Sequence, residues 1–422
     1  MEWVDILPNQ TSKRSWRADK LSQIGSSIFA EVSEWKQEAF QAGRHIIDLS
    51  IGSPDRGPSE DIREVLSQEA LKADNYTYPG TRGTMEFREQ SASWMQHRFG
   101  VNVNPDTEIL ALMGSQDGLS HLAQAICNPG DVAIVPNPGY PIYAGALAIA
   151  GVTPWYLPLK EEFGFVPDLD SIPEEIWAKA TFILLNFPGN PIAVRADLAF
   201  FEKLVGLAKK WDVLIVHDLA YSEMGFDGYR PMSILQVPGA IDIAVEFHSF
   251  SKSFNMAGCR IGFLAGHEEA VSALREYKSN IDFGVFKPVQ IAAVHALRQA
   301  MASAHEEQGI ASLYEHRRDV LVASLAEAGW VVPKPQATMF LWARLPDAFR
   351  DLQWSSRRFA RELLLETGVA VIPGDAFGSE GEGYVRIALV QGEAALREAA
   401  LRIGTFIQGG NSPVPRAFEP LS

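Results

Sequence analysis

The sequence contains only two cysteines, Cys127 and Cys259, among 422 residues. Two thiols are too few for a disulfide framework or for a metal site built from thiolates in a chain of this size. We therefore predict no metal site. Because free thiols are typical of reducing compartments, we expect a cytoplasmic protein.

Long apolar segments and an excess of positive charge are also missing. No stretch reaches the roughly 18 uninterrupted apolar residues of a membrane-spanning helix, and residues 1–20 lack the apolar core of a signal peptide. The chain has 37 Lys and Arg against 52 Asp and Glu, a net charge of −15. Nucleic acids and anionic membranes are bound by clustered positive charge, so this balance argues against both as partners.

Short apolar runs alternate with helical patterns over much of the chain. The runs are continuously apolar rather than alternating, which is typical of strands covered on both faces. They lie at 108–114, 131–138, 181–188, 212–218, 243–250 and 260–266. This order predicts an α/β domain with a mostly parallel central sheet flanked by helices.

The length exceeds what one core usually holds, so a second domain is expected. After a helical region at about 267–328, the order strand, helix, strand, helix predicts a smaller α+β domain. We assign residues 51–295 to the large domain and 296–408 to the small one. Residues 409–422 are rich in Gly, Pro and Ser and are predicted to be a loose tail.

Polar side chains follow several of the predicted strands. In open α/β sheets, ligands bind outside the carboxyl ends of the strands, so these residues are candidates for a site. A phosphate is favoured where a strand passes into the start of a helix, because the free backbone N–H groups there attract anions. The candidates are Ser115, Gln116, Tyr140, Asn190, Asp218, Tyr221, and the group Ser249, Ser251, Lys252 and Arg260 in "HSFSKSFNMAGCRIG".

One cofactor, pyridoxal phosphate, requires all of these groups together. It needs an amine for a Schiff base, a carboxylate for its pyridine nitrogen, donors at its ring oxygen and an anion site. Lys252 is the candidate amine and Asp218 the candidate carboxylate, with Tyr221 and Asn190 as donors. Tyr140 is placed to stack on the ring. The remaining serines, Gln116 and Arg260 are expected at the phosphate.

The chain resembles the fold type I, class I/II aminotransferases. The likeness rests on Ser-Phe-Ser-Lys-x7-Arg, on the order of Asn190, Asp218, Tyr221, Lys252 and Arg260, and on Arg386 in "YVRIAL". It covers about residues 20–408. The phrases "GSQDGLSHLA" and "VEFHSFSKSFNMAG" are most similar to the LL-diaminopimelate aminotransferase-like branch.

This resemblance implies roles for individual residues. Lys252 would bind the cofactor and then move a proton between the substrate α-carbon and the cofactor. Arg386 would bind the substrate α-carboxylate as a planar fork, with help from Asn190 and the backbone of Gly52. Tyr78 would reach the phosphate of a neighbouring subunit in a homodimer. Residues 1–50 would contribute to the small domain.

The sequence departs from the usual pattern around the substrate pocket. Asn190 is followed by Pro191-Ile192-Ala193 where Pro-Thr-Gly is common in the family. Cys259 stands where relatives often have a larger aromatic residue, and Phe283 stands where a small residue is frequent. We expect a reshaped pocket. The predicted function is transfer of an amino group between an L-amino acid and a 2-oxo acid by ping-pong chemistry. The alternatives are a lyase or oxidase on the same scaffold, and a ligand-sensing regulator, for whose DNA-binding domain the chain leaves no room.

Overall fold

The computed structural model of the chain describes residues 16–24, 28–302 and 309–409. The predicted tail therefore lies outside the described residues, except for Gly409, which ends the last helix. Within the described part, no helix is long and apolar enough to cross a membrane. The same residues contain no group of three or more His, Cys, Asp or Glu side chains suited to a metal ion.

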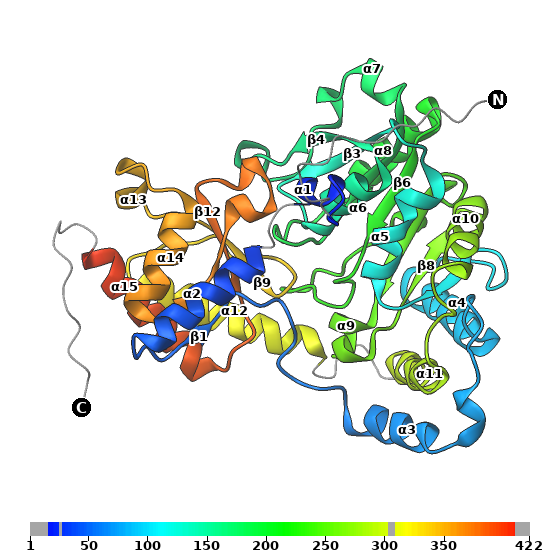
Figure 1. Cartoon of the computed structure of the whole chain (residues 1–422), viewed down its shortest axis with the longest axis horizontal. Coiled ribbons are helices and arrows are strands. Elements are labelled where there is room, and N and C mark those ends of the chain that lie inside the picture. Colours follow the sequence, from blue (N-terminus) through cyan, green and yellow to red (C-terminus); the bar gives the residue numbers. More distant parts are fainter. Residues whose placement is uncertain (1–15, 25–27, 303–308, 410–422) are drawn as a thin grey trace, which may run out of the picture.

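A seven-stranded sheet forms the centre of the larger part of the molecule (Figure 1). Its strands are parallel except for β8, which runs antiparallel to both of its neighbours. In spatial order they are β2 (Ile109–Leu112), β8 (Gly262–Gly266), β7 (Ala244–Ser249), β6 (Leu214–Asp218), β5 (Ala180–Leu185), β3 (Val132–Asn137) and β4 (Thr153–Pro158). The predicted mostly parallel sheet is thereby confirmed.

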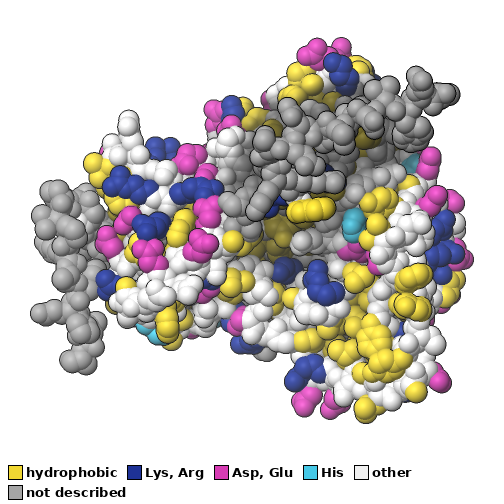
Figure 2. All heavy atoms as spheres, viewed as in Figure 1, with side chains coloured by type: hydrophobic (Ala, Val, Ile, Leu, Met, Phe, Trp, Pro, Cys, Tyr) yellow, Lys and Arg dark blue, Asp and Glu magenta, His cyan; other side chains and the backbone are white. Residues whose placement is uncertain are grey.

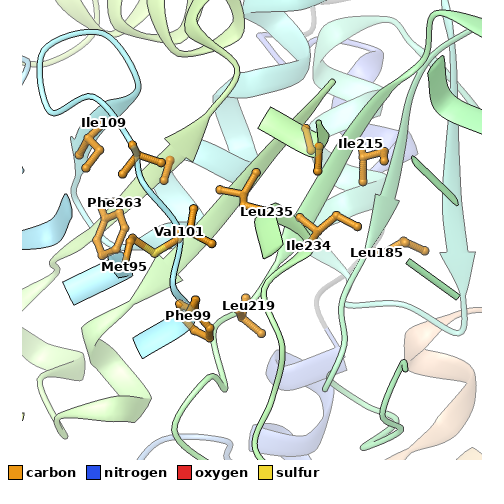
Figure 3. Close-up of a cluster of buried hydrophobic side chains, with 14 of the residues drawn as sticks. Met95, Phe99, Val101, Ile109, Leu185, Ile215, Leu219, Ile234, Leu235 and Phe263 are labelled. Carbon is orange, nitrogen blue, oxygen red and sulfur yellow. The ribbon is translucent and has the colours of Figure 1, made fainter. Parts of the chain in front are cut away.

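Helices cover both faces of this sheet, which explains why its strands are continuously apolar. On one face, α5 (Ser115–Ile126) packs against α6 (Ile142–Ala150) and α10 (Glu268–Ser279). The other face carries the main hydrophobic core, where Phe263 of β8 and Ile215 of β6 are buried (Figure 3). The helices contributing to this core include α4 (Met85–Phe99), α8 (Leu198–Trp211) and α11 (Lys287–Ala302).

The smaller part has a core of its own around a three-stranded antiparallel sheet. Its strands, in the order β11 (Ile372–Pro373), β12 (Tyr384–Ala388) and β9 (Phe340–Arg344), pair antiparallel. The helices of this part are α2 (Ile28–Gln41), α12 (Ile310–Glu327), α13 (Asp347–Asp351), α14 (Ser356–Thr367) and α15 (Glu393–Gly409).

Segments from both ends of the chain meet in this smaller part. Helix α2 packs on α14, and β1 (Ile47–Asp48) pairs in parallel with β10 (Val369–Ala370). The chain then leaves β1 and enters the larger part through α3 (Glu60–Ala70), which packs on α11. The predicted boundary at 295 falls inside α11, and the domain limits remain a prediction.

Candidate active site

The strands of the large sheet bring the predicted site residues to one edge. Parallel neighbours β5, β6 and β7 end at the same side, and a polar residue stands at or directly after each of these ends. Asp218 is the last residue of β6, and Ser249 is the last residue of β7. The short helix α9 (Phe250–Ser253) follows directly and carries Lys252.

Lys252 lies mostly inside the protein, with its ammonium turned toward the chain segment after β1. Its Nζ donates a hydrogen bond to the carbonyl oxygen of Gly52 over 2.5 Å. Burial, together with the positive charges of Arg386 and Arg260, lowers the pKa of Lys252 to about 8. Near neutral pH this amine is therefore uncharged far more often than an ordinary lysine, and the uncharged form is the one that attacks a carbonyl carbon.

Asp218 is a buried carboxylate with one oxygen left unsatisfied. Its Oδ2 accepts a hydrogen bond from the hydroxyl of Tyr143 over 2.7 Å, and its backbone oxygen accepts one from Nδ2 of Asn186 over 2.6 Å. The other carboxylate oxygen, Oδ1, is buried without a partner. Burial raises the pKa of Asp218. An unpaired buried acceptor is costly, so this site fits a ligand that brings a cationic N–H group.

Two tyrosines lie close to this carboxylate. Tyr221 is buried with its ring 5.9 Å from that of Phe340, and burial raises its pKa so that the hydroxyl remains protonated. The hydroxyl of Tyr140 lies 3.2 Å from Oε1 of Gln116. Both tyrosines lie within electrostatic range of Asp218.

A tight turn after β2 fits an anion. Gly114 has a φ of 79°, and a Cβ added there would lie 2.6 Å from Nη2 of Arg260. Only glycine permits this close approach of the guanidinium to the turn. Helix α5 begins at the next residue, Ser115, so its first backbone N–H groups and Arg260 share one region.

Ser249 and Ser251 flank the start of α9. The hydroxyl of Ser249 accepts a hydrogen bond from the backbone N–H of Ser251 over 3.2 Å, so it caps this short helix. Both serines are buried. Their contribution to an anion site remains a prediction.

Arg386 is buried in β12 and its guanidinium points toward the large sheet. Nη1 donates to Oδ1 of Asn190 over 2.9 Å, and Nη2 donates to the carbonyl of Ser50 over 2.6 Å. The group lies over the rings of Phe340 and Phe377, with centroids 4.3 and 5.0 Å away. Burial lowers its pKa to about 10, so it stays charged at neutral pH.

Tyr78 lies apart from this cluster on the surface. Its side chain is 85 % exposed, and its ring lies 5.0 Å from the ring of Phe283. The predicted role of Tyr78 at a second subunit therefore stays a prediction.

The charges of the site favour an anionic ligand. The positive charges of Arg386 and Arg260 both act on Lys252, so cationic groups outnumber the one buried carboxylate of the site, Asp218. The amine with a lowered pKa, the unsatisfied Oδ1 of Asp218 and the glycine turn beside Arg260 match the aldehyde, the ring nitrogen and the phosphate of pyridoxal phosphate. The residues present therefore fit this cofactor.

The comparison with known proteins decides the class. The chain matches the family "Aminotransferase class I and II" over residues 44–403. It is a member of that family. The predicted enzyme class and the predicted cofactor are thereby confirmed: the aminotransferase depends on pyridoxal phosphate and transfers an amino group between an amino acid and a 2-oxo acid.

Curated relatives of the aminotransferase are similar over almost their whole length. It is 42 % identical over 387 residues to the LL-diaminopimelate aminotransferase of Natranaerobius thermophilus, which covers 92 % of this chain and 98 % of the relative. It is 41 % identical to LL-diaminopimelate aminotransferase 2 of a Nostoc species, over 92 % of this chain and 97 % of the relative.

Solved structures share the fold of the aminotransferase. Substrate-bound BacF from Bacillus subtilis has a TM-score of 0.86 at 34 % identity, covering 93 % of this chain and 98 % of BacF. A probable N-succinyldiaminopimelate aminotransferase from Thermus thermophilus has a TM-score of 0.82 at 38 % identity, covering 90 % and 100 % of the two chains.

Some residues of the aminotransferase site were missed by the sequence analysis. Tyr143 from α6, which donates to Asp218, and Asn186, which lies just after β5, were not predicted. Nor were Ser50 and Phe340, which contact Arg386. Asn186 stands at a strand end and carried the same signal as Asn190, whereas Tyr143 lies within an otherwise apolar helix that gives no such signal.

Proposed function

We propose that Lys252 is the residue to which pyridoxal phosphate is bound and that Arg386 binds the α-carboxylate of the amino acid. The observation that carries this proposal is the pairing of an amine of lowered pKa with a buried, charged guanidinium in one site. Bound pyridoxal phosphate supplies an aldehyde and a ring that withdraws electrons from the substrate α-carbon.

The other residues then have defined tasks. Asp218 keeps the ring nitrogen protonated through its free Oδ1, since a carboxylate beside a cation stabilises the charged form. Tyr221 and Asn190 would donate hydrogen bonds to the ring oxygen, and Tyr140 would stack on the ring. The residues that would hold the phosphate are Ser115, Gln116, Ser249, Ser251 and Arg260.

Lys252 also moves the proton. When it is not bonded to the cofactor, its amine would take the proton from the substrate α-carbon and return it at C4′ of the bound cofactor. The lowered pKa suits a group that must be a base and then an acid near neutral pH. Arg386 would bind the carboxylate as a planar fork. The Gly52 backbone lies beside both groups: its carbonyl oxygen is 2.5 Å from Nζ of Lys252, and a Cβ added at Gly52 would lie 3.8 Å from Nη1 of Arg386.

Replacing the lysine tests this assignment. Lys252→Ala should give a folded protein in which borohydride no longer fixes the cofactor to the chain and which has lost turnover. Cofactor that is still trapped on another lysine in this variant, located by peptide mapping, would contradict the assignment.

We further propose a cytoplasmic homodimer with shared sites. Exposed apolar side chains gather near the start of α11, where Figure 2 shows a hydrophobic patch. They include Tyr76 and Phe286, whose rings lie 5.4 Å apart, and Tyr78 and Phe283, whose rings lie 5.0 Å apart. Contiguous apolar patches of this kind mark protein interfaces. A second copy of the chain would cover the patch and receive Tyr78 at its phosphate.

The names of the relatives make LL-diaminopimelate the first amino donor to test. This diamino acid has a charged amino acid group at each end, so one end on Arg386 leaves a second end that needs polar partners. Ile192 and Phe377, which lie in the cluster beside Arg386, are apolar and buried. A screen of amino acids against 2-oxo acids tests whether LL-diaminopimelate is the preferred donor. A kcat/KM for LL-diaminopimelate no higher than for monocarboxylic amino acids would exclude it.

A further inference from the structure

Lys278 of α10 is a fully buried lysine held between two carboxylates. Its side chain is 0 % exposed, its ammonium contacts the carboxylate of Asp117, and Nζ lies 2.7 Å from Oδ2 of Asp282. A buried ammonium is stable only with such partners, so all three charges depend on one another. The chemistry described above uses none of them.

Asp117 belongs to the turn proposed to bind the phosphate. It lies in the first turn of α5, and its Oδ2 also accepts a hydrogen bond from the backbone N–H of Met113 over 2.9 Å. Its Oδ1 lies 3.0 Å from Nδ1 of His121. Burial raises the pKa of Asp117, but His121 and Lys278 outweigh burial and the pKa lies below its ordinary value. The ionised carboxylate thus connects the end of β2 to the start of α5.

Asp282 belongs to the surface segment that carries Phe283. Its Oδ1 accepts a hydrogen bond from the backbone N–H of Gly284 over 2.7 Å, which shapes the turn. Gly284 has a φ of 93°, and a Cβ there would lie 2.7 Å from the carbonyl oxygen of Gly80. The turn therefore packs directly on the loop that carries Tyr78, whose ring contacts Phe283.

A second buried side chain holds the same two segments together. Gln290 of α11 accepts a hydrogen bond at Oε1 from the backbone N–H of Thr84 over 2.7 Å. Its Nε2 donates to the carbonyl of Val285 over 2.6 Å. Residues 78–84 and 281–286 thus pack on each other and share hydrogen bonds to Gln290. The position of Asp282 therefore affects the position of Tyr78.

We propose that Lys278 is a positioning residue that couples the two cofactor sites of the homodimer. Through Asp117 it holds the turn that binds the phosphate of its own subunit. Through Asp282 it holds Tyr78 in the position from which Tyr78 reaches the phosphate of the other subunit. The inference rests on the homodimer proposed above.

The direction of this coupling can be tested with Asp282→Asn. This substitution leaves the Lys278–Asp117 contact in place, and the amide oxygen can still accept from Gly284. Replacing Lys278 itself removes the cation shared by two partly buried carboxylates and risks misfolding, so it serves as a second variant, judged first by circular dichroism. Asp242→Asn, which removes a carboxylate 3.6 Å from Lys209 on another surface, is the matched control.

Hybrid dimers with one Lys252→Ala subunit isolate a single site. Only the subunit that keeps Lys252 gives the absorbance of the lysine-bound cofactor. Asp282→Asn is placed either in that subunit or in the Lys252→Ala subunit, and pyridoxal phosphate is titrated into the cofactor-free hybrid. We expect affinity to fall about five- to tenfold when the substitution is in the opposite subunit, and less than about twofold when it is in the same subunit.

The control and the second variant complete the test. Asp242→Asn should leave both titrations unchanged, and a folded Lys278→Met should weaken binding in both placements. Equal effects of Asp282→Asn in the two placements, or none in either, would overturn the coupling. A monomer in sedimentation equilibrium would instead refute the dimer itself, which is a separate failure.

Discussion

Nη1 of Arg386 donates a hydrogen bond to Oδ1 of Asn190 over 2.9 Å, and this contact links the three-stranded sheet to the segment that follows β5 of the seven-stranded sheet. Arg386 comes from β12 of the small sheet, whereas Asn190 follows β5 of the large one. The guanidinium is therefore held in one orientation before a substrate arrives. Preorganisation of this kind favours a planar, two-pronged contact with a carboxylate.

The shape of this contact predicts the effect of Arg386→Lys. Lysine keeps the charge but loses the fork and the contact with Asn190. The fall in kcat/KM should therefore correspond to about 1.5–3 kcal/mol, the free energy of a charged hydrogen bond. The loss should be the same for every amino acid, because all share the α-carboxylate. A loss confined to one substrate, in steady-state kinetics on a series of amino acids, would place Arg386 at the side chain instead.

The lowered pKa of Lys252 predicts how cofactor capture depends on pH. A depressed pKa means that the amine becomes uncharged above about 8, well below the usual range for lysine. The rate at which the cofactor-free enzyme forms the covalent link should therefore rise through pH 8 and level off above it. Stopped-flow absorbance at a series of pH values measures this, and a rise that continues toward pH 10 would contradict the assigned environment.

Asp218→Asn should separate stability from function. The raised pKa shows that the folded protein disfavours the charged carboxylate, a penalty present above the ordinary pKa of Asp. Without cofactor, the variant should therefore have a higher free energy of unfolding than the wild type at pH 7, and the difference should shrink as pH falls toward 4. Urea unfolding of both proteins at the two pH values measures it.

With pyridoxal phosphate bound, the wild type rather than the variant should have the higher free energy of unfolding. The variant lacks the ionic contact to the ring nitrogen, so its affinity for pyridoxal phosphate should drop by about 10- to 100-fold, as for a charged hydrogen bond. Unchanged affinity would remove Asp218 from the ring nitrogen.

The proposed shared site predicts complementation between two defective subunits. Lys252→Ala subunits are inactive and Tyr78→Ala subunits should be severely impaired, yet a mixed dimer has one site with both residues intact. Mixing the two proteins under conditions of subunit exchange should restore activity. If exchange is demonstrated by mass and activity stays absent, Tyr78 serves its own subunit or the fold.

Much of the large sheet could be predicted because its strands are covered on both faces. The apolar run at 212–218 became β6 (Leu214–Asp218), and the run at 243–250 became β7 (Ala244–Ser249). Strand β4 (Thr153–Pro158) was missed, because it lies at the edge of the sheet, contains two prolines and has exposed residues. Its sequence therefore lacks the continuous apolar signal.

The candidate site was predictable where its residues stand at strand ends. Asp218 and Lys252 occupy such positions, and their side-chain types indicate their chemistry. The partner of Asp218, Tyr143, lies within α6 on another segment, and Lys278 is an ordinary helical lysine by sequence. Their importance arises only when distant segments pack together, which local patterns do not report.

The half-reaction without an acceptor tests the central claim, transamination, most directly. If Lys252 returns the proton at C4′, the cofactor keeps the nitrogen as pyridoxamine phosphate and releases one equivalent of 2-oxo acid. A suitable amino acid alone should then bleach the absorbance of the lysine-bound cofactor once, and added 2-oxo acid should restore it. Sustained turnover without acceptor that releases ammonia or peroxide, with no pyridoxamine phosphate formed, would contradict the account.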